Sequence, residues 1–246
     1  MNEFLKEYYS LITHSLEIMA AVTGLFLYKK YELTAAKYFV YFLFYLTFFD
    51  FLSGYTYPSY IHSELFMSFL KGTVLEKNYW LSTLYWKIGA IMFFAFYYGK
   101  ILNYQSFKNI IKYISYGFFV FSIIYILLNW SAFFTSYFPI ISILGSIVIF
   151  LCTIFYFIEL LQSETILTFY KSLNFYISAA IFIWWLIITP IVFYDNYTSY
   201  TVGIYERDWD YIELRRLIYI SANIFMYSTF TFALIFCKPE IKIDKV

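Results

Sequence analysis

Among the polar side chains that lie inside otherwise apolar stretches of this 246-residue sequence, five are candidates for a shared site: His14, Glu17, Asp50, Lys87 and Asn223. An ionisable group in the hydrocarbon core of a membrane costs at least about 2.5–3.5 kcal/mol, so such a residue faces other protein groups or water. His14 and Glu17 are three residues apart and therefore share one face of a helix. The sequence thus predicts that polar groups from several helices meet inside a bundle.

The depth of the four ionisable residues along their helices places them at one level. Counted at 1.5 Å per residue, all four fall roughly 7–12 Å below the outer surface of a membrane. We predict that the Lys87 ammonium is held between the carboxylates of Asp50 and Glu17, with His14 alongside. Asn223 adds a polar group at a similar depth.

Two interpretations of this predicted cluster remain open. In the first, it is a buried polar lock that fixes the packing of the first three helices. In the second, it is the floor of an outward-facing pocket that binds a small polar ligand or exchanges a proton. The additional polar group of Asn223 favours a pocket over an isolated ion pair.

Motifs typical of enzymes are missing from the sequence. It contains no phosphate-binding loop, no dinucleotide-binding glycine pattern, no zinc-protease helix and no CxxC pair. Two histidines are too few for a histidine-rich metal site. Cys152 and Cys237 lie far apart in apolar runs, which is typical of small hydrophobic residues. We therefore expect no catalytic residues, no cofactor and no metal.

The composition indicates a membrane protein. Of the residues, 62% are hydrophobic, 27% are aromatic and 13% are charged, with a mean hydropathy of +0.67. Soluble domains have about 45–50% apolar and about 25% charged residues. A formal net charge of +1 gives no basic field that could gather nucleic acid.

Seven apolar runs are long enough to cross a bilayer as helices, which takes about 20 residues each. We therefore expect an all-α fold, a single seven-helix transmembrane domain over residues 1–246. The expected helices cover residues 9–28, 35–55, 79–102, 113–134, 138–161, 174–194 and 216–237.

The distribution of lysine and arginine predicts the orientation of these helices. If the N-terminus is outside, ten of the 17 basic residues lie on the cytoplasmic side and six on the other, with Lys87 inside a helix. The excess on one side favours an outer N-terminus and a cytoplasmic C-terminus. The expected location is a bacterial-type inner membrane.

Short motifs in four of the helices resemble a known group of proteins. They are Asn78-Tyr79-Trp80-Leu81, Phe49-Asp50-Phe51, Asn174-Phe175-Tyr176-Ile177-Ser178 and Ala222-Asn223-Ile224. In these motifs the chain is similar to small seven-helix integral membrane proteins of bacteria, which look like stand-alone sensors or accessory proteins and are often found beside signalling histidine kinases. The resemblance implies a sensor and supplies no catalytic residues.

The expected function is that of a non-enzymatic sensor or receptor-like protein. Its expected partners are the lipid bilayer, another membrane or signalling protein, and a small polar ligand. The alternative is an assembly subunit of a larger cell-envelope complex. A transporter is less favoured, because the chain shows no inverted repeat and has only 8 Gly and 4 Pro to break its helices.

Overall fold

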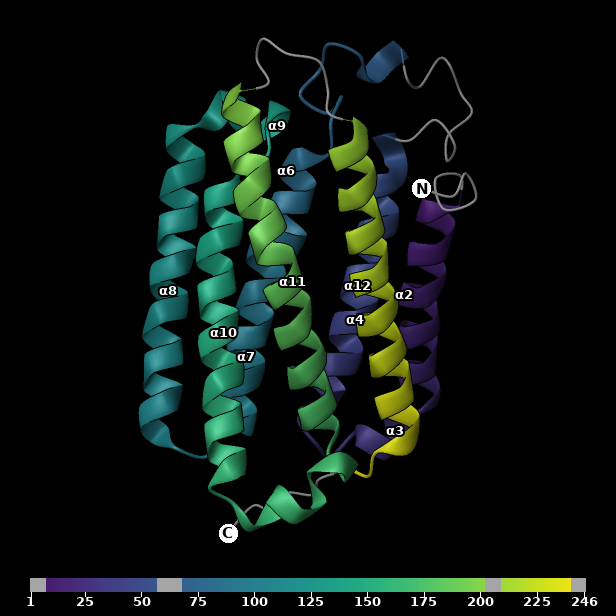
Figure 1. Ribbon diagram of the computed structural model, residues 1–246, viewed down its shortest axis with the longest axis vertical. Helices are drawn as coiled ribbons and strands as arrows, with labels where there is room; N and C mark the ends of the chain where they lie inside the picture. The colour runs from purple at the N-terminus through teal and green to yellow at the C-terminus, as the bar shows by residue number, and fades with distance from the viewer. Residues whose placement is uncertain (1–7, 57–67, 202–208, 240–246) are drawn as a thin grey trace.

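A computed structural model describes residues 8–56, 68–201 and 209–239, and these residues form a bundle of helices that run up and down one long axis (Figure 1). We call the end where the first helix begins the upper end, and the end where the last helix, Trp209–Phe236, finishes the lower end. In the described residues, the bridge between Ser172 and Lys238 at the lower end is the one β-type pairing.

Six long helices make up most of the bundle. They are α2 (Tyr9–Phe26), α4 (Ala36–Ser53), α8 (Gln105–Leu128), α10 (Pro139–Leu161), α11 (Leu173–Thr201) and α12 (Trp209–Phe236). Short helices connect or extend them: α3 (Tyr28–Tyr31), η1 (Gly54–Thr56), α9 (Trp130–Thr135) and η3 (Glu164–Lys171). One further stretch crosses the bundle, third in chain order after α2 and α4. It is divided into α6 (Tyr79–Ser82), a π-helical segment η2 (Thr83–Ala90) and α7 (Ile91–Ile101).

Five helices of the described chain are long and apolar enough to cross a membrane. They are Ala36–Thr56, Gln105–Leu128, Pro139–Leu161, Leu173–Asp195 and Asp210–Phe236. This confirms the prediction of a helical, multi-pass membrane protein. The first and third expected spans are outside this set, because His14 and Glu17 interrupt the apolar run of α2 and because the third is divided by η2.

Four predicted helix ends are wrong. The fourth helix starts at Gln105 instead of 113 and breaks at Asn129, where the backbone leaves the helical region at φ −119° and ψ 40°. α11 continues to Thr201, and α12 begins at Trp209 instead of 216. At Gln105, Thr201 and Trp209, polar residues extend the helix beyond its apolar run.

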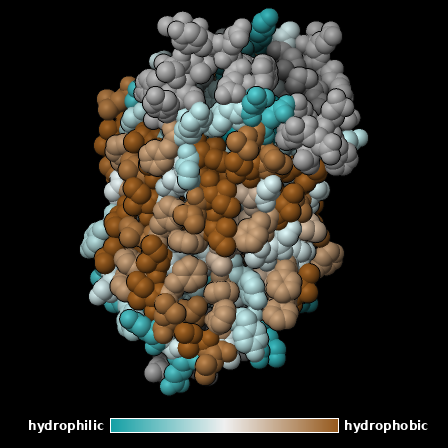
Figure 2. Space-filling model, in the orientation of Figure 1, coloured by the Kyte–Doolittle hydropathy of each residue, from teal (hydrophilic) through white to brown (hydrophobic). Residues whose placement is uncertain are grey.

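The outer surface of the bundle is apolar in the middle. Figure 2 shows hydrophobic side chains over the centre of the visible face and hydrophilic ones toward both ends. Phe26, Phe51 and Leu128 are examples of large apolar side chains that are mainly exposed. A water-soluble protein rarely exposes apolar surface on this scale, whereas lipid tails would cover it favourably.

Aromatic side chains fill the interior and anchor their hydroxyl groups within the protein. The rings of Phe42 and Phe93 stack with centroids 4.0 Å apart. Tyr97 donates to Asn174 at 2.6 Å, and the fully buried Tyr98 donates to Ser178 at 2.8 Å. A buried phenol needs such a partner, since a membrane interior offers no water to replace it.

Glu159, near the lower end of α10, binds the start of α8. Its two carboxylate oxygens accept the backbone N–H groups of Asn103 and Tyr104, each at 2.7 Å. The side chain is 7% exposed. Glu159 thus satisfies two donors where α8 begins and joins α8 to α10.

Glu159→Gln is expected to lower the free energy of unfolding by about 1–2 kcal/mol, because an amide keeps one acceptor oxygen and loses the charge that strengthens both bonds. Thermal unfolding in detergent measures this change. Glu164→Gln is the matched control, since Glu164 is exposed on η3. Equal unfolding temperatures for the two variants would contradict the assigned role.

Candidate functional site

His14 of α2 and Asp50 of α4 form an ion pair in the upper half of the bundle. The His14 Nε2 atom lies 3.0 Å from the Asp50 Oδ2 atom. The other ring nitrogen, Nδ1, lies 2.6 Å from the carbonyl oxygen of Ser10. A carbonyl oxygen only accepts, so Nδ1 carries a hydrogen. The contact between Nε2 and Oδ2 then requires a second proton, which the imidazole and the carboxyl group share.

The second Asp50 oxygen fixes the divided helix. Tyr85 of η2 donates its hydroxyl group to Asp50 Oδ1 at 2.8 Å. Tyr85 itself is 8% exposed. Asp50 therefore holds α2 through His14 and η2 through Tyr85, and both of its oxygens have partners.

Glu17 lies one turn below His14 on the same face of α2 and is 7% exposed. Its neighbours include the hydroxyl group of Tyr227 on α12 and the carboxyl group of Asp50. Among the described residues, Glu17 Oε2 has no hydrogen-bond partner. We call His14, Glu17, Asp50, Tyr85 and Tyr227 the histidine–carboxylate cluster.

The proton inventory of this cluster determines its chemistry. Two carboxyl groups close together in a medium of low dielectric constant repel each other when both are charged. The His14 cation balances one of these charges. A proton on Glu17 would balance the other and leave the cluster neutral. The unpartnered Glu17 oxygen can accept a hydrogen bond or, when protonated, donate one to an added group.

The predicted position of Lys87 between Asp50 and Glu17 is wrong. The Lys87 ammonium nitrogen lies 3.0 Å from the centroid of the Tyr137 ring and has no hydrogen-bond partner among the described residues. Tyr85 explains this difference. Residues two apart on a helix point in roughly opposite directions, so if Tyr85 faces Asp50, Lys87 faces away from it.

Lys87 instead belongs to a second polar group near the upper end. Arg215 of α12 lies within electrostatic range of both Lys87 and Tyr137. Its Nε atom binds the Asp195 oxygens of α11 at 2.8 and 3.0 Å. The positive charge of Arg215 is balanced by Asp195. Among the described residues, the Lys87 ammonium group contacts an aromatic ring and no anion.

Asn223 of α12 has its partner on α11. Its Oδ1 atom accepts the indole N–H of Trp184 at 2.8 Å, which joins α12 to α11. Sequence reasoning missed Tyr85 and Tyr227. With 29 tyrosines in the chain, residue type alone does not single out two of them.

A cavity of about 260 Å³ lies beside His14 between α2 and α4. The rest of its wall is formed by Ile18, Phe44, Thr47, Phe48 and Phe51. Phe48 and Phe51 are 63% and 67% exposed, so this cavity belongs to the apolar flank of the bundle. The sequence predicted a pocket that opens at the outer end of the bundle. This cavity lies at the side of the bundle instead.

Metal binding finds no support in the described residues, where no group of three or more His, Cys, Asp and Glu side chains is placed to hold an ion. The resemblance to bacterial seven-helix sensors stays a prediction. No protein-family model matches the sequence, and comparisons with curated proteins and with solved structures find no significant match.

Proposed function

We propose that this protein is a non-enzymatic, receptor-like membrane sensor that binds a small amphiphile between α2 and α4. The observation that carries the proposal is the cavity beside His14, which brings an apolar wall and a proton-sharing ion pair together. The ligand's polar group would bind at His14 and Asp50. Its hydrocarbon part would lie against Phe44 and Phe48.

The chemical class of the ligand follows from the wall of the cavity. The cavity wall is almost entirely apolar, which suits a molecule with a short apolar body, and its one hydrogen-bonding head would reach the ion pair at His14. The volume of about 260 Å³ is near the lower limit of ordinary ligand pockets, which hold roughly 300–1,000 Å³. A full-length lipid would therefore place only part of itself inside.

The cluster offers a route from binding to a change in the bundle. A ligand that takes an Asp50 oxygen competes with the hydroxyl group of Tyr85 and so changes how η2 is held. π-Helical segments are rare and occur frequently at functional sites. Because the cluster joins α2, α4, η2 and α12, two arrangements of these helices would differ in ligand affinity, as a sensor requires.

The proposal includes seven spans in a bacterial inner membrane, with α2 and the Tyr79–Ile101 path as the first and third. The N-terminus would be outside, the C-terminus cytoplasmic, and a membrane or signalling partner would receive the signal. The basic residues that support this orientation include Lys29, Lys30 and Lys37 at the lower end.

A subunit of a larger complex is the second candidate. The observation that favours it is that His14, Asp50 and Tyr85 already satisfy one another. In that case the cluster is a polar lock, and the exposed wall of Phe48 and Phe51 is an interface with another protein.

One cross-linking experiment separates these functions. A photoreactive phenylalanine analogue at position 48 is expected to capture a defined small amphiphile in native membranes, and His14→Gln is expected to reduce this capture. The matched control is position 193 on α11, where Phe193 is also exposed and apolar and does not line the cavity. Capture of a protein chain would favour the subunit. The same bulk lipids at both positions would contradict a ligand site.

A further inference from the structure

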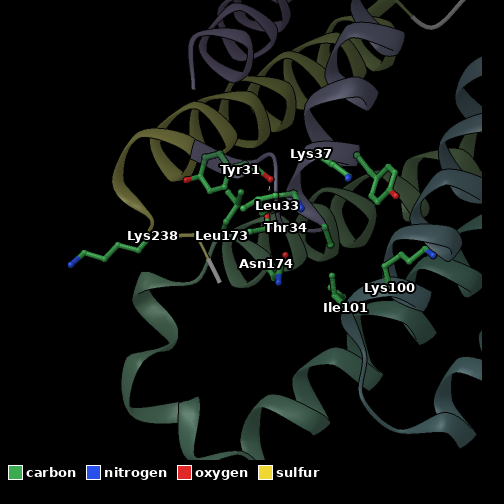
Figure 3. Close-up of a pocket in the computed structure, with 12 residues that line it drawn as sticks. Tyr31, Leu33, Thr34, Lys37, Lys100, Ile101, Leu173, Asn174 and Lys238 are labelled. Carbon is green, nitrogen blue, oxygen red and sulfur yellow. Dashed lines mark hydrogen bonds between the residues drawn. The ribbon is translucent and has the colours of Figure 1, made fainter. Parts of the chain in front are cut away.

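A second cavity, of about 360 Å³, opens at the lower end of the bundle (Figure 3). Four parts of the chain form it: the turn between α3 and α4, the end of α7, the start of α11 and the residue Lys238 after α12. These segments are far apart in sequence, so the cavity is a product of the fold. It lies at the opposite end of the bundle from the histidine–carboxylate cluster.

The cavity carries positive charge. Its lining includes Lys37, Lys100 and Lys238, each from a different segment, and none of its lining residues is acidic. Leu173 and Asn174 add the N-terminus of α11, a helix of 29 residues whose first N–H groups carry partial positive charge. Lys37 and Lys100, with Lys238 at the rim of the cavity, and a helix N-terminus favour an anion.

The ammonium groups of two of the three lysines lie beside aromatic rings. Figure 3 shows Lys37 and Lys100 on one side of the cavity and Lys238 extending outward on the other. The Lys37 ammonium rests 5.3 Å from the Tyr38 ring. The Lys100 ammonium rests 5.5 Å from the Phe96 ring. A phosphate attracts an ammonium group more strongly than an exposed aromatic face does.

The depth of the cavity identifies the source of the anion. Ala36 and Leu173 each begin a candidate membrane span, and Lys238 follows soon after another span ends at Phe236. The lining is therefore level with the ends of the spans, where lipid headgroups lie. We propose that this cavity binds the phosphate-bearing headgroup of an anionic phospholipid.

Native mass spectrometry of the full chain in detergent tests this site. With equal amounts of phosphatidylglycerol and phosphatidylcholine, we expect preferential retention of phosphatidylglycerol. The triple variant Lys37→Gln, Lys100→Gln, Lys238→Gln is expected to lose this preference about ten-fold or more, since each lysine near a membrane surface adds to the attraction of anionic lipid.

The matched control is Lys108→Gln, Lys112→Gln, Lys171→Gln, which removes the same charge without touching the lining. Equal lipid retention by the two triple variants would overturn the proposal. If the first triple variant does not fold, single variants at the half-buried Lys37 and the exposed Lys238 are each expected to show part of the loss, and unchanged retention in both would overturn it.

Competition with inorganic phosphate distinguishes the headgroup from a free anion. Retention of phosphatidylglycerol in millimolar phosphate supports a lipid site, because the glycerol and acyl parts add contacts that phosphate lacks. Complete displacement would overturn the assignment to a lipid. Because the readout is lipid retention at the lower end, failure here leaves the amphiphile site beside His14 unaffected.

Discussion

Asp50→Ala is expected to lower the free energy of unfolding by about 2–3 kcal/mol. The change removes the acceptor for both His14 Nε2 and the Tyr85 hydroxyl group, and it leaves two donors unpartnered inside the bundle. Losing one partner of a fully buried pair costs about 3–5 kcal/mol, and of an exposed pair about 0–1 kcal/mol. The side chains of His14 and Asp50 are 18% and 25% exposed, which places the expected loss between these limits.

A double-mutant cycle tests whether the two side chains act together. Asp50→Ala, His14→Ala and the double variant are compared by unfolding in detergent, and we expect a coupling of about 1–2 kcal/mol. Asp50→Asn keeps an acceptor for Tyr85 and is expected to cost less. Asp210→Ala, at an exposed carboxyl group, is the control for loss of a charge. Additive losses would show that His14 and Asp50 do not stabilise each other.

The helices were predictable where an apolar run and a helix coincide. For the helix from Pro139 to Leu161, a proline at the first turn and an unbroken apolar run define both ends. They do not coincide at Trp209, where the charged residues Asp210 and Arg215 continue the helix above the apolar part. Hydropathy indicates which residues are favourable in lipid. The helical hydrogen bonds continue past these residues, so hydropathy does not predict where the helix begins.

The cluster was predictable in part, because depth and rotation are separate properties of a helical residue. His14 and Glu17 share a face by their spacing, and Asp50 lies at the same depth, so their meeting follows from both. Lys87 lies at the same depth as these residues, but its side chain points to a different side of its helix. Neither the rotation of the third helix nor its π-helical segment leaves a signal in the sequence that spacing rules detect.

The cavity at the lower end could not be predicted from the sequence as a binding site. Lys37, Lys100 and Lys238 are among the ten basic residues that predict a cytoplasmic side, and this prediction concerns only which loops carry positive charge. Their gathering around one space depends on how the ends of α7, α11 and α12 pack. Contacts between segments so far apart in the chain cannot be predicted from the spacing of residues in the sequence.

Lys87→Met is expected to raise the free energy of unfolding by about 1–3 kcal/mol. Lys87 is 3% exposed, and its ammonium group has no hydrogen-bond partner among the described residues. The ring of Tyr137, 3.0 Å away, returns only part of the cost of removing this charge from water, since a cation over an aromatic face contributes about 0.5–2 kcal/mol. Methionine has a similar length and no charge, so the substitution removes the cost and keeps the packing.

Unfolding of the Lys87→Met variant in detergent measures this effect, with Lys71→Met as the matched control at an exposed lysine, where the change is expected to stay within about 0.5 kcal/mol. Lys87→Gln separates charge from polarity: it keeps a buried polar group and is expected to be less stable than Lys87→Met. A less stable Lys87→Met variant would mean that the ammonium group has a favourable partner. Lys87 would then be a stabilising member of the bundle, as the lock interpretation of the sequence requires.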